Sequence, residues 1–341
     1  MAIQILFTHN LRRDLTDEAQ AEFDTPETVE SLAAALGCAG QHAVELLDVS
    51  APLPEVMAKL SAFQPDLVFN TAEGRLGRAR AAQMPAILEM LGLAFVGSDS
   101  YVLAVTQDKW LTKQAAAAVG VPTPPSRLFF GPGLPALLDA ELEPLLPAIV
   151  KPNYEGSSKG ISDDSVVQDV ASLRTVLARQ LAQFPQGVLV ERFLAGRDVT
   201  VPFVAAFGQT ILDGVLTPVE YCVESQFASR FNLYDYRLKN VDYSGLSLCC
   251  PARLSDSELL RVRQMTASIV QAFGIVDLAR ADFRIDEAGN IHFLEVNPLP
   301  SLEAGASLFV AAERAGYSFE QTIAAVVDGA YARFRASAAH S

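Results

Sequence analysis

The stretch from Ala281 to Ser301 concentrates carboxylate, amide and guanidinium side chains in a pattern that could bind metal ions and phosphate. Residues 281–286 and 291–297 alternate apolar and polar positions, and residues 287–290 between them have turn chemistry. This pattern predicts a β-hairpin. A turn centred in the middle of the connecting segment predicts these cross-strand pairs: Asp286 with Ile291, Asp282 with Glu295, and Arg280 with Asn297.

The two faces of this hairpin differ in character, because side chains alternate between faces and cross-strand partners share one. The predicted inner face is apolar and carries Phe283, Ile285, Leu294 and Val296. The predicted outer face carries Arg280, Asp282, Glu295 and Asn297. Carboxylate and amide oxygens are hard ligands that suit Mg²⁺, and a neighbouring arginine indicates a phosphate or carboxylate substrate. A surface hairpin with a cross-strand polar ladder is the alternative interpretation.

Length, charge and cysteine content limit the class of protein. The 341 residues, half of them apolar, suffice for about two or three folded domains. A formal net charge of −14 argues against nucleic acid and anionic membranes as partners. No apolar run reaches the ~20 residues of a membrane span, and the run Ile3–Phe7 is expected to be a first strand. The four cysteines form no CxxC pair, which predicts reduced thiols in a cytoplasmic protein.

Residues 1–104 alternate strand-like and helical patterns, which predicts a parallel sheet with helices on its faces. The expected strands are 3–8, 43–49, 66–72 and 94–96, and the expected helices are 25–36, 52–63 and 78–91. Ligands of such sheets lie at the carboxyl ends of the strands. The loop at 71–74 is therefore a candidate site edge, with Glu73 as either a site residue or a solvated loop charge.

A long helix is expected next, from a cap at Ser98 or Asp99 to about Val119. It would carry Lys109 and Lys113, and lysines on helices are most often solvated. The Pro- and Gly-rich residues 120–125 then break the chain and predict a domain boundary.

Lys151 interrupts an apolar strand expected at 148–152, so it needs an anionic partner or a wet pocket. The Gly- and Ser-rich loop at 153–160 could close over phosphates, although it lacks the Walker A spacing. A plain surface turn is the alternative. A strand is expected at 188–193, with an antiparallel partner strand at 199–206, and a further strand is expected at 211–219. The remaining expected helices are 170–181, 255–273 and 317–336. An irregular aromatic segment, 221–247, is predicted to form a lid that carries Lys239.

Taken together, these segments resemble the ATP-grasp superfamily, and within it the D-alanine–D-alanine ligase-like family. The resemblance runs from about Asp66 to about Arg335. The segments on which the resemblance rests are 72–100, QDKWLTK at 107–113, IVKPNYEGSSKGI at 149–161, VLVERFLAGRDVTV at 188–201, YDYRLKN at 234–240 and ARADFRI…FLEVNPLPSL at 279–302. It implies an α/β fold with an N-terminal parallel-sheet domain (1–104), a central ATP-grasp lobe (105–187) and an α+β C-terminal lobe (188–341).

The resemblance also implies roles for residues around the nucleotide. Three lysines would contact the phosphates: Lys109, Lys151 and Lys239. A linker would line the adenine pocket, with an acid at the ribose: Glu191, Arg192, Phe193, Leu194 and Asp198. A loop would close over the γ-phosphate of ATP: Glu155, Gly156, Ser157, Ser158 and Gly160.

Other roles concern metal ions and substrates. Two Mg²⁺ (or Mn²⁺) ions would be held by Asp282, Glu295 and Asn297. Arg280 would hold the oxygens of the acyl phosphate or the carboxylate of the second substrate. Ser307 would lie near that carboxylate. The catalytic residues would be Arg280, Ser157 and Lys239. Glu73 stands where the dedicated D-alanine ligases often carry a histidine, and Asn240 stands in place of their usual tyrosine. The acid for the first substrate's amino group has no clear counterpart, with Glu27 as the candidate.

These expectations favour an ATP-dependent ligase that joins amino acids, or an amino acid and a small carboxylate, through an acyl phosphate. A D-alanine–D-alanine ligase for peptidoglycan precursors is the first alternative, and a non-catalytic nucleotide-binding regulator is the second. The expected partners are small molecules, with neither nucleic acid nor membrane. The oligomeric state is left open between a monomer and a homodimer.

Overall fold

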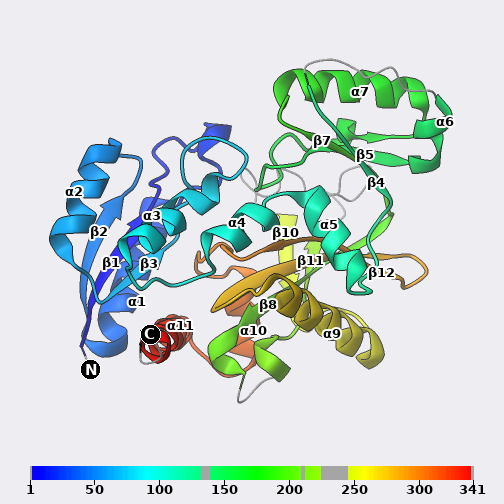
Figure 1. Ribbon diagram of the computed structural model, residues 1–341. Helices are drawn as coiled ribbons and strands as arrows, with labels where there is room; N and C mark the ends of the chain where they lie inside the picture. The colour runs from blue at the N-terminus through cyan, green and yellow to red at the C-terminus, as the bar shows by residue number, and fades with distance from the viewer. Residues whose placement is uncertain (1, 132–138, 209–211, 224–244, 339–341) are drawn as a thin grey trace.

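The computed structural model describes residues 2–131, 139–208, 212–223 and 245–338, and their strands form three separate sheets. Figure 1 shows a three-stranded sheet from the first part of the chain in blue on the left. A four-stranded sheet lies at the upper right in green, and a five-stranded sheet lies across the lower centre. None of the described helices is both long and apolar enough to cross a membrane.

The N-terminal sheet consists of β1 (Gln4–His9), β2 (Ala43–Asp48) and β3 (Leu67–Asn70), in the order β2-β1-β3. All its pairs are parallel, which confirms the sequence prediction. The central strand is apolar on both faces and buried after Gln4, as expected for a strand covered by helices on either side. The helices of this unit are α1 (Pro26–Gly40), α2 (Leu53–Phe63) and α3 (Gln83–Leu91). The strand expected at 94–96 is reduced to a single parallel bridge between Val68 and Phe95.

The long helix expected up to Val119 is wrong, because two helices take its place: α4 (Ser100–Thr106) and α5 (Lys109–Ala118). Asp108 causes the break. Its side chain accepts from the backbone N–H of Leu111 at 3.0 Å and thereby caps the second helix. Short acidic side chains favour this capping position over a helix interior. The break makes Lys109 the first residue of α5.

The four-stranded sheet has the order β4-β7-β5-β6. Its strands are β4 (Ser126–Phe129), β5 (Ala148–Pro152), β6 (Val166–Val167) and β7 (Val188–Arg192). It has two accompanying α-helices, α6 (Asp139–Leu142) and α7 (Val170–Gln183). In Figure 1, α7 covers this sheet on the side away from the rest of the molecule. The apolar side chains of α7 and of the sheet form one core, which includes Val150, Leu173 and Val190.

The five-stranded sheet has the order β10-β9-β8-β11-β12. Its strands are β8 (Gly196–Val204), β9 (Val219–Val223), β10 (Leu246–Cys249), β11 (Leu278–Asp286) and β12 (Ile291–Asn297). The expected pairing of 188–193 with 199–206 is wrong, because both edges of β7 are already paired with β4 and β5. The strand expected at 211–219 is also wrong in extent, since Asp213 and Gly214 adopt left-handed backbone angles (φ 47° and 79°).

The predicted hairpin forms, and its register is correct where the polar residues lie. Arg280 pairs with Asn297, and Asp282 pairs with Glu295. The register then shifts by one residue, so that Ile285 and not Asp286 faces Ile291. The extra residue on β12 is Leu294, which the shift removes from the apolar face predicted for it. A bulge of this kind redirects a side chain without ending the hairpin.

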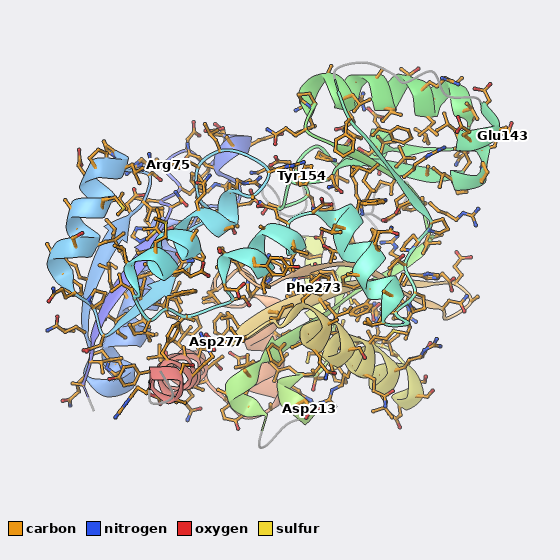
Figure 2. The ribbon with its side chains drawn as sticks, viewed as in Figure 1. Arg75, Glu143, Tyr154, Asp213, Phe273 and Asp277 are labelled. Carbon is orange, nitrogen blue, oxygen red and sulfur yellow. The ribbon has the colours of Figure 1, made fainter. Side chains whose placement is uncertain are left out.

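The C-terminal helices are α9 (Asp256–Phe273), α10 (Ser307–Arg314) and α11 (Phe319–Ala338). The α9 helix packs against the five-stranded sheet, and α10 and α11 join that sheet to the N-terminal unit. The α11 helix packs against α1, and one continuous core includes Phe7, Leu32, Phe309 and Val327. Arg333 of α11 pairs at 2.6 Å with Asp277, which is labelled in Figure 2 and also accepts from the backbone of Gly97. The first and last parts of the chain therefore form one packed body.

A buried ion-pair cluster connects α5 to the four-stranded sheet. The Lys113 Nζ lies 2.6 Å from one oxygen of Glu191, and the Lys151 Nζ lies 3.1 Å from the other. The side chains of Lys113 and Glu191 are 0% and 3% exposed. Lys113 was expected to be solvated, and this expectation is wrong. Its pKa is lowered to about 8 by burial, although Glu191 opposes the shift.

We predict that Glu191→Gln lowers the free energy of unfolding by about 3–5 kcal/mol, because two buried ammonium groups would lose their shared carboxylate. Equilibrium urea denaturation followed by circular dichroism measures this loss. The matched control is Glu141→Gln, which removes one partner of an exposed pair with Arg127 and should change stability by less than about 1 kcal/mol. Equal effects of the two substitutions would contradict the assignment of the cluster as a buried stabilising unit.

Candidate active site

A first pocket lies between the four-stranded and five-stranded sheets. Its empty space measures about 1020 Å³, its open mouth included. The predicted nucleotide-binding residues that line it are Lys109, Lys151, Glu155, Gly156, Ser158, Glu191, Arg192, Phe193, Leu194 and Asp198. Arg280, Asp282 and Glu295 also line it. The structure thus brings together residues that lie far apart in the sequence.

Two lysines of this pocket are held by carboxylates. The Nζ of Lys109 lies 3.2 Å from an oxygen of Glu295, and Lys151 pairs with Glu191. Both lysine residues are buried, at 8% and 6% exposure. Their ammonium groups are positioned by the first turn of α5 and by the centre of β5, so little freedom remains to be lost when an anion binds. The third predicted lysine, Lys239, lies outside the described residues.

The other end of the first pocket is more apolar. Phe193 and Leu194 line it, together with the bulge residue Leu294. Arg284 organises this end: it pairs with Asp198 at 2.6 Å, donates to the backbone oxygen of Leu194, and lies over the ring of Phe193. Sequence reasoning missed Arg284, although alternation places it on the same hairpin face as Arg280 and Asp282, because its partner Asp198 comes from a neighbouring strand whose pairing was not predicted.

The loop at 155–160 is shaped by left-handed backbone angles. Ser157 and Ser158 have φ values of 49° and 56°. Gly160 has a φ of 71°, and a side chain there would lie 2.9 Å from Pro152 and 3.0 Å from Phe184. Gly156 approaches a carboxylate so closely that any larger residue would displace it. Backbone turns with left-handed residues are a feature of many loops that bind anions.

A buried charge cluster anchors this loop to the N-terminal sheet, and none of its connections was predicted. Glu22 pairs with Arg80 and with Lys159 of the loop, each at 2.6 Å. Arg80 also lies 3.2 Å from Glu155 and donates to the backbone oxygen of Tyr154, which Figure 2 shows between the two units. Burial would raise the pKa of Glu22, but the two cations outweigh it and lower that pKa to about 2.

The hairpin presents the carboxylates of Asp282 and Glu295 to the first pocket and the amide of Asn297 to the adjoining second pocket. Asp282 accepts from Thr200 at 2.6 Å and is gripped by Arg280 through two nitrogens. Within the described residues, no group of three or more His, Cys, Asp or Glu side chains is arranged to hold a metal ion. The oxygen donors of Asp282, Glu295 and Asn297 nevertheless fit Mg²⁺, which usually takes only one or two carboxylates and completes its shell with phosphates and water.

A second pocket adjoins the first, at the carboxyl end of the N-terminal sheet. Its polar lining includes Arg12, Glu22, Asp24, Thr71, Glu73, Ser157, Tyr221, Arg280, Asn297, Ser301, Glu303 and Ser307. All three predicted substrate residues, Glu73, Arg280 and Ser307, lie here. The predicted loop residue Ser157 lines this pocket as well, whereas Gly160 lines neither pocket.

Two acids of the second pocket hold protons unusually strongly. Burial raises the pKa of Asp24 to about 7, against the opposing effect of its hydrogen bond from Thr71. Burial and the nearby Glu22 raise the pKa of Glu73 well above its ordinary value. Glu27, the candidate for an amino-group acid, is exposed on α1 and does not line the pocket. Glu22 and Asp24 lie there instead, and their only signal was their place just before the helix.

Comparisons with known proteins agree with this arrangement. The family model for the D-ala D-ala ligase C-terminus matches residues 136–328. The D-alanine–D-alanine ligase of Aquifex aeolicus is 32% identical over 288 residues, covering 84% of this chain and 89% of that protein.

Two solved structures share the fold. D-alanine–D-alanine ligase from Bacillus anthracis, complexed with ATP, aligns over 98% of this chain and 100% of its own with a TM-score of 0.77 and 18% identity. VanG D-Ala:D-Ser ligase from Enterococcus faecalis aligns over 97% of this chain and 100% of its own with a TM-score of 0.71 and 19% identity. From the family model and the Aquifex relative, the chain belongs to the D-alanine–D-alanine ligase family, and it is an ATP-grasp ligase that forms carbon–nitrogen bonds.

Proposed function

We propose that this protein joins a carboxylate donor to the amine of an amino acid by way of an acyl phosphate, at the expense of ATP. The observation that carries the proposal is the junction of the two pockets: Gly156, Tyr221, Arg280 and Glu295 line both. A nucleotide in the first pocket would place its terminal phosphate against a carboxylate in the second. Proximity of this kind removes much of the entropic barrier to a reaction between two bound molecules.

The proposed chemistry has two steps. A carboxylate is a poor acyl donor at neutral pH, so one of its oxygens first attacks the γ-phosphorus of ATP and ADP leaves. The amine of the acceptor then attacks the carbonyl carbon of the acyl phosphate. Phosphate leaves, and the amine loses a proton to give the neutral amide. Both steps place negative charge at the junction, which favours fixed cations there.

The chain supplies such cations from three elements. Lys109 begins α5, Lys151 lies in β5, and Arg280 lies in β11. The loop at 155–160 would close over the reacting phosphate and exclude water, which would otherwise hydrolyse the acyl phosphate. Mg²⁺ held by the hairpin oxygens would neutralise charge on the phosphate groups.

Formation of D-alanyl-D-alanine is the second candidate, because the relatives that carry that name share the family. The departures at the donor side, Glu73 and Asn240, favour another donor. Phosphate release and product mass spectrometry, over a panel of donors and acceptors of both configurations, test the proposal. Faster formation of D-alanyl-D-alanine than of every other product would support the second candidate. Absence of ATP-dependent product from every pair would favour a non-catalytic regulator.

We also propose that the protein works in the cytoplasm on small molecules. The structure leaves the four cysteines free, as expected for a reducing compartment. The net charge of −14 disfavours nucleic acid and anionic membranes as partners.

The metal assignment predicts that Glu295→Gln and Asn297→Ala each lower kcat by roughly 100-fold or more, and that EDTA abolishes activity until Mg²⁺ or Mn²⁺ is restored. Steady-state phosphate release measures both effects. Glu287→Gln is the matched control, because Glu287 is exposed at the turn of the same hairpin. Full activity of either hairpin variant, or of the protein in EDTA, would contradict the assignment.

Arg280 is predicted to hold the acceptor carboxylate through two parallel hydrogen bonds, a geometry that lysine cannot reproduce. Arg280→Lys should therefore lower kcat/KM by roughly 100-fold, and an amino-acid amide should be a much poorer acceptor than the free acid. Arg261→Lys, at an exposed position on α9, serves as control. An amide that reacts as fast as the acid would refute the acceptor half of the assignment.

The acids of the second pocket predict a pH effect on stability. The folded-state pKa of Asp24, about 7, lies above its ordinary value of 3.8, so the folded protein is destabilised progressively as pH rises through this interval. Asp24→Asn removes the charge and keeps an oxygen for Thr71. The melting temperature of the variant relative to the wild type should therefore increase from pH 5 to pH 8.

Melting curves at several pH values measure this difference. Asp139→Asn, at an exposed position of α6, controls for loss of a surface charge. A difference between Asp24→Asn and wild type that does not change with pH would show that Asp24 has no raised pKa.

A further inference from the structure

Arg12 is a buried cation of the second pocket that no role described above uses. The residue is 6% exposed and lines the pocket. Its Nη2 donates to the backbone oxygen of Leu15 at 2.9 Å, but its Nε is buried and makes no hydrogen bond. No aspartate or glutamate in the described part of the chain forms an ion pair with it. Burial of an unpaired charge is costly, which makes this guanidinium a candidate for binding an anion.

The adjacent arginine shows the ordinary alternative. The side chain of Arg13 is 62% exposed and pairs with Asp48 on the surface. The two arginines therefore differ in exposure and in partners, although they are neighbours in the sequence. This contrast makes Arg13 a matched control for Arg12.

The N-terminus of α1 lies beside Arg12 in the same pocket. The backbone N–H of Arg12 donates to the backbone oxygen of Asp24, which precedes the capping residue Thr25. Thr25 and Thr28 both line the pocket, and their hydroxyls lie 3.1 Å apart. The 15-residue helix directs its positive dipole end toward this corner. A guanidinium and a helix N-terminus thus favour negative charge at one place.

The remainder of the second pocket has the opposite character. Glu22, Asp24 and Glu73 line it, and a bound ammonium would offset the burial that raises the pKa of Asp24 and of Glu73. Both regions belong to one pocket, whose empty space measures about 1590 Å³, its open mouth included. A substrate that satisfies both regions must carry an amine and an additional anion.

We propose that the donor carries a second carboxylate on its side chain, distinct from the α-carboxylate that is phosphorylated, and that Arg12 and the N-terminus of α1 bind this second carboxylate. The donor class is therefore a small dicarboxylate, with an amino-dicarboxylic acid as the best match to the acids opposite. Arg12 determines specificity and takes no part in phosphoryl or acyl transfer. This inference rests on the proposed ligase function and names the substrate class of the same site.

The test compares glutamate with glutamine as donors, each in both configurations, because the pair differs in charge and hardly in shape. The acceptor is the one that gives the fastest turnover in the product panel. We expect wild-type kcat/KM to favour glutamate of one configuration by roughly 10–100-fold, as one charge-assisted contact provides. In Arg12→Met the ratio of kcat/KM for glutamate to that for glutamine should fall close to one, mainly because KM for glutamate rises. Arg12→Lys should keep part of the wild-type ratio. Arg13→Met should keep the wild-type ratio.

Each outcome decides between the proposals. A wild-type ratio near one, or a ratio that survives in folded Arg12→Met, overturns the role of Arg12. Product from a monocarboxylic donor alone leaves the ligase function intact and refutes the dicarboxylate inference. No product from any donor refutes the ligase function and this inference with it. The wild-type ratio is decisive even when Arg12→Met fails to fold, a failure that its melting curve would reveal.

Discussion

The burial of several cations at one junction is the constraint on which the active site depends. Lys109, Lys113 and Lys151 are all buried where α5 meets the four-stranded and five-stranded sheets. Like charges repel strongly where water is excluded. Glu191 and Glu295 compensate them, and these carboxylates come from different sheets. The arrangement that holds this junction together therefore also positions the cations to which we assign the phosphate contacts.

Buried charges are also paired at the second pocket, where one carboxylate is shared by two cations. There Glu22 is the shared partner of Arg80 and Lys159, so one carboxylate connects the N-terminal unit to the loop that borders the first pocket. If that loop moves, either the ion pair between Lys159 and Glu22 breaks or Glu22 moves with the loop. Under the proposed function, closure of the loop over the nucleotide and the shape of the donor region would be linked through Glu22, which would let donor binding influence the reaction with ATP.

Comparison of sequence and structure separates local from non-local information. The helix at 255–273, the parallel N-terminal strands and the pairing of Asp282 with Glu295 were predictable, because each depends on residues close in the chain or on simple periodicity. The split at Asp108 was missed because an acid inside a helical pattern resembles a surface charge until its acceptor geometry is known. The bulge at Leu294 was missed because the register was taken from a turn centred between residues 288 and 289, whereas Ile285 faces Ile291 beside the turn and the bulge then restores the predicted pairing of Asp282 with Glu295.

The sequence alone determined the fold class, the family resemblance and most residues of the first pocket, because their spacing follows contiguous motifs. Only the tertiary structure decided which charges meet. The partners of Glu22 come from residues 80 and 159, the partners of Glu191 from residues 113 and 151, and Arg12 proves to have none among the described acids. The physical reason is that burial and the pairing of charges depend on distances in space, and chain folding brings those residues together from segments with no sequence pattern in common.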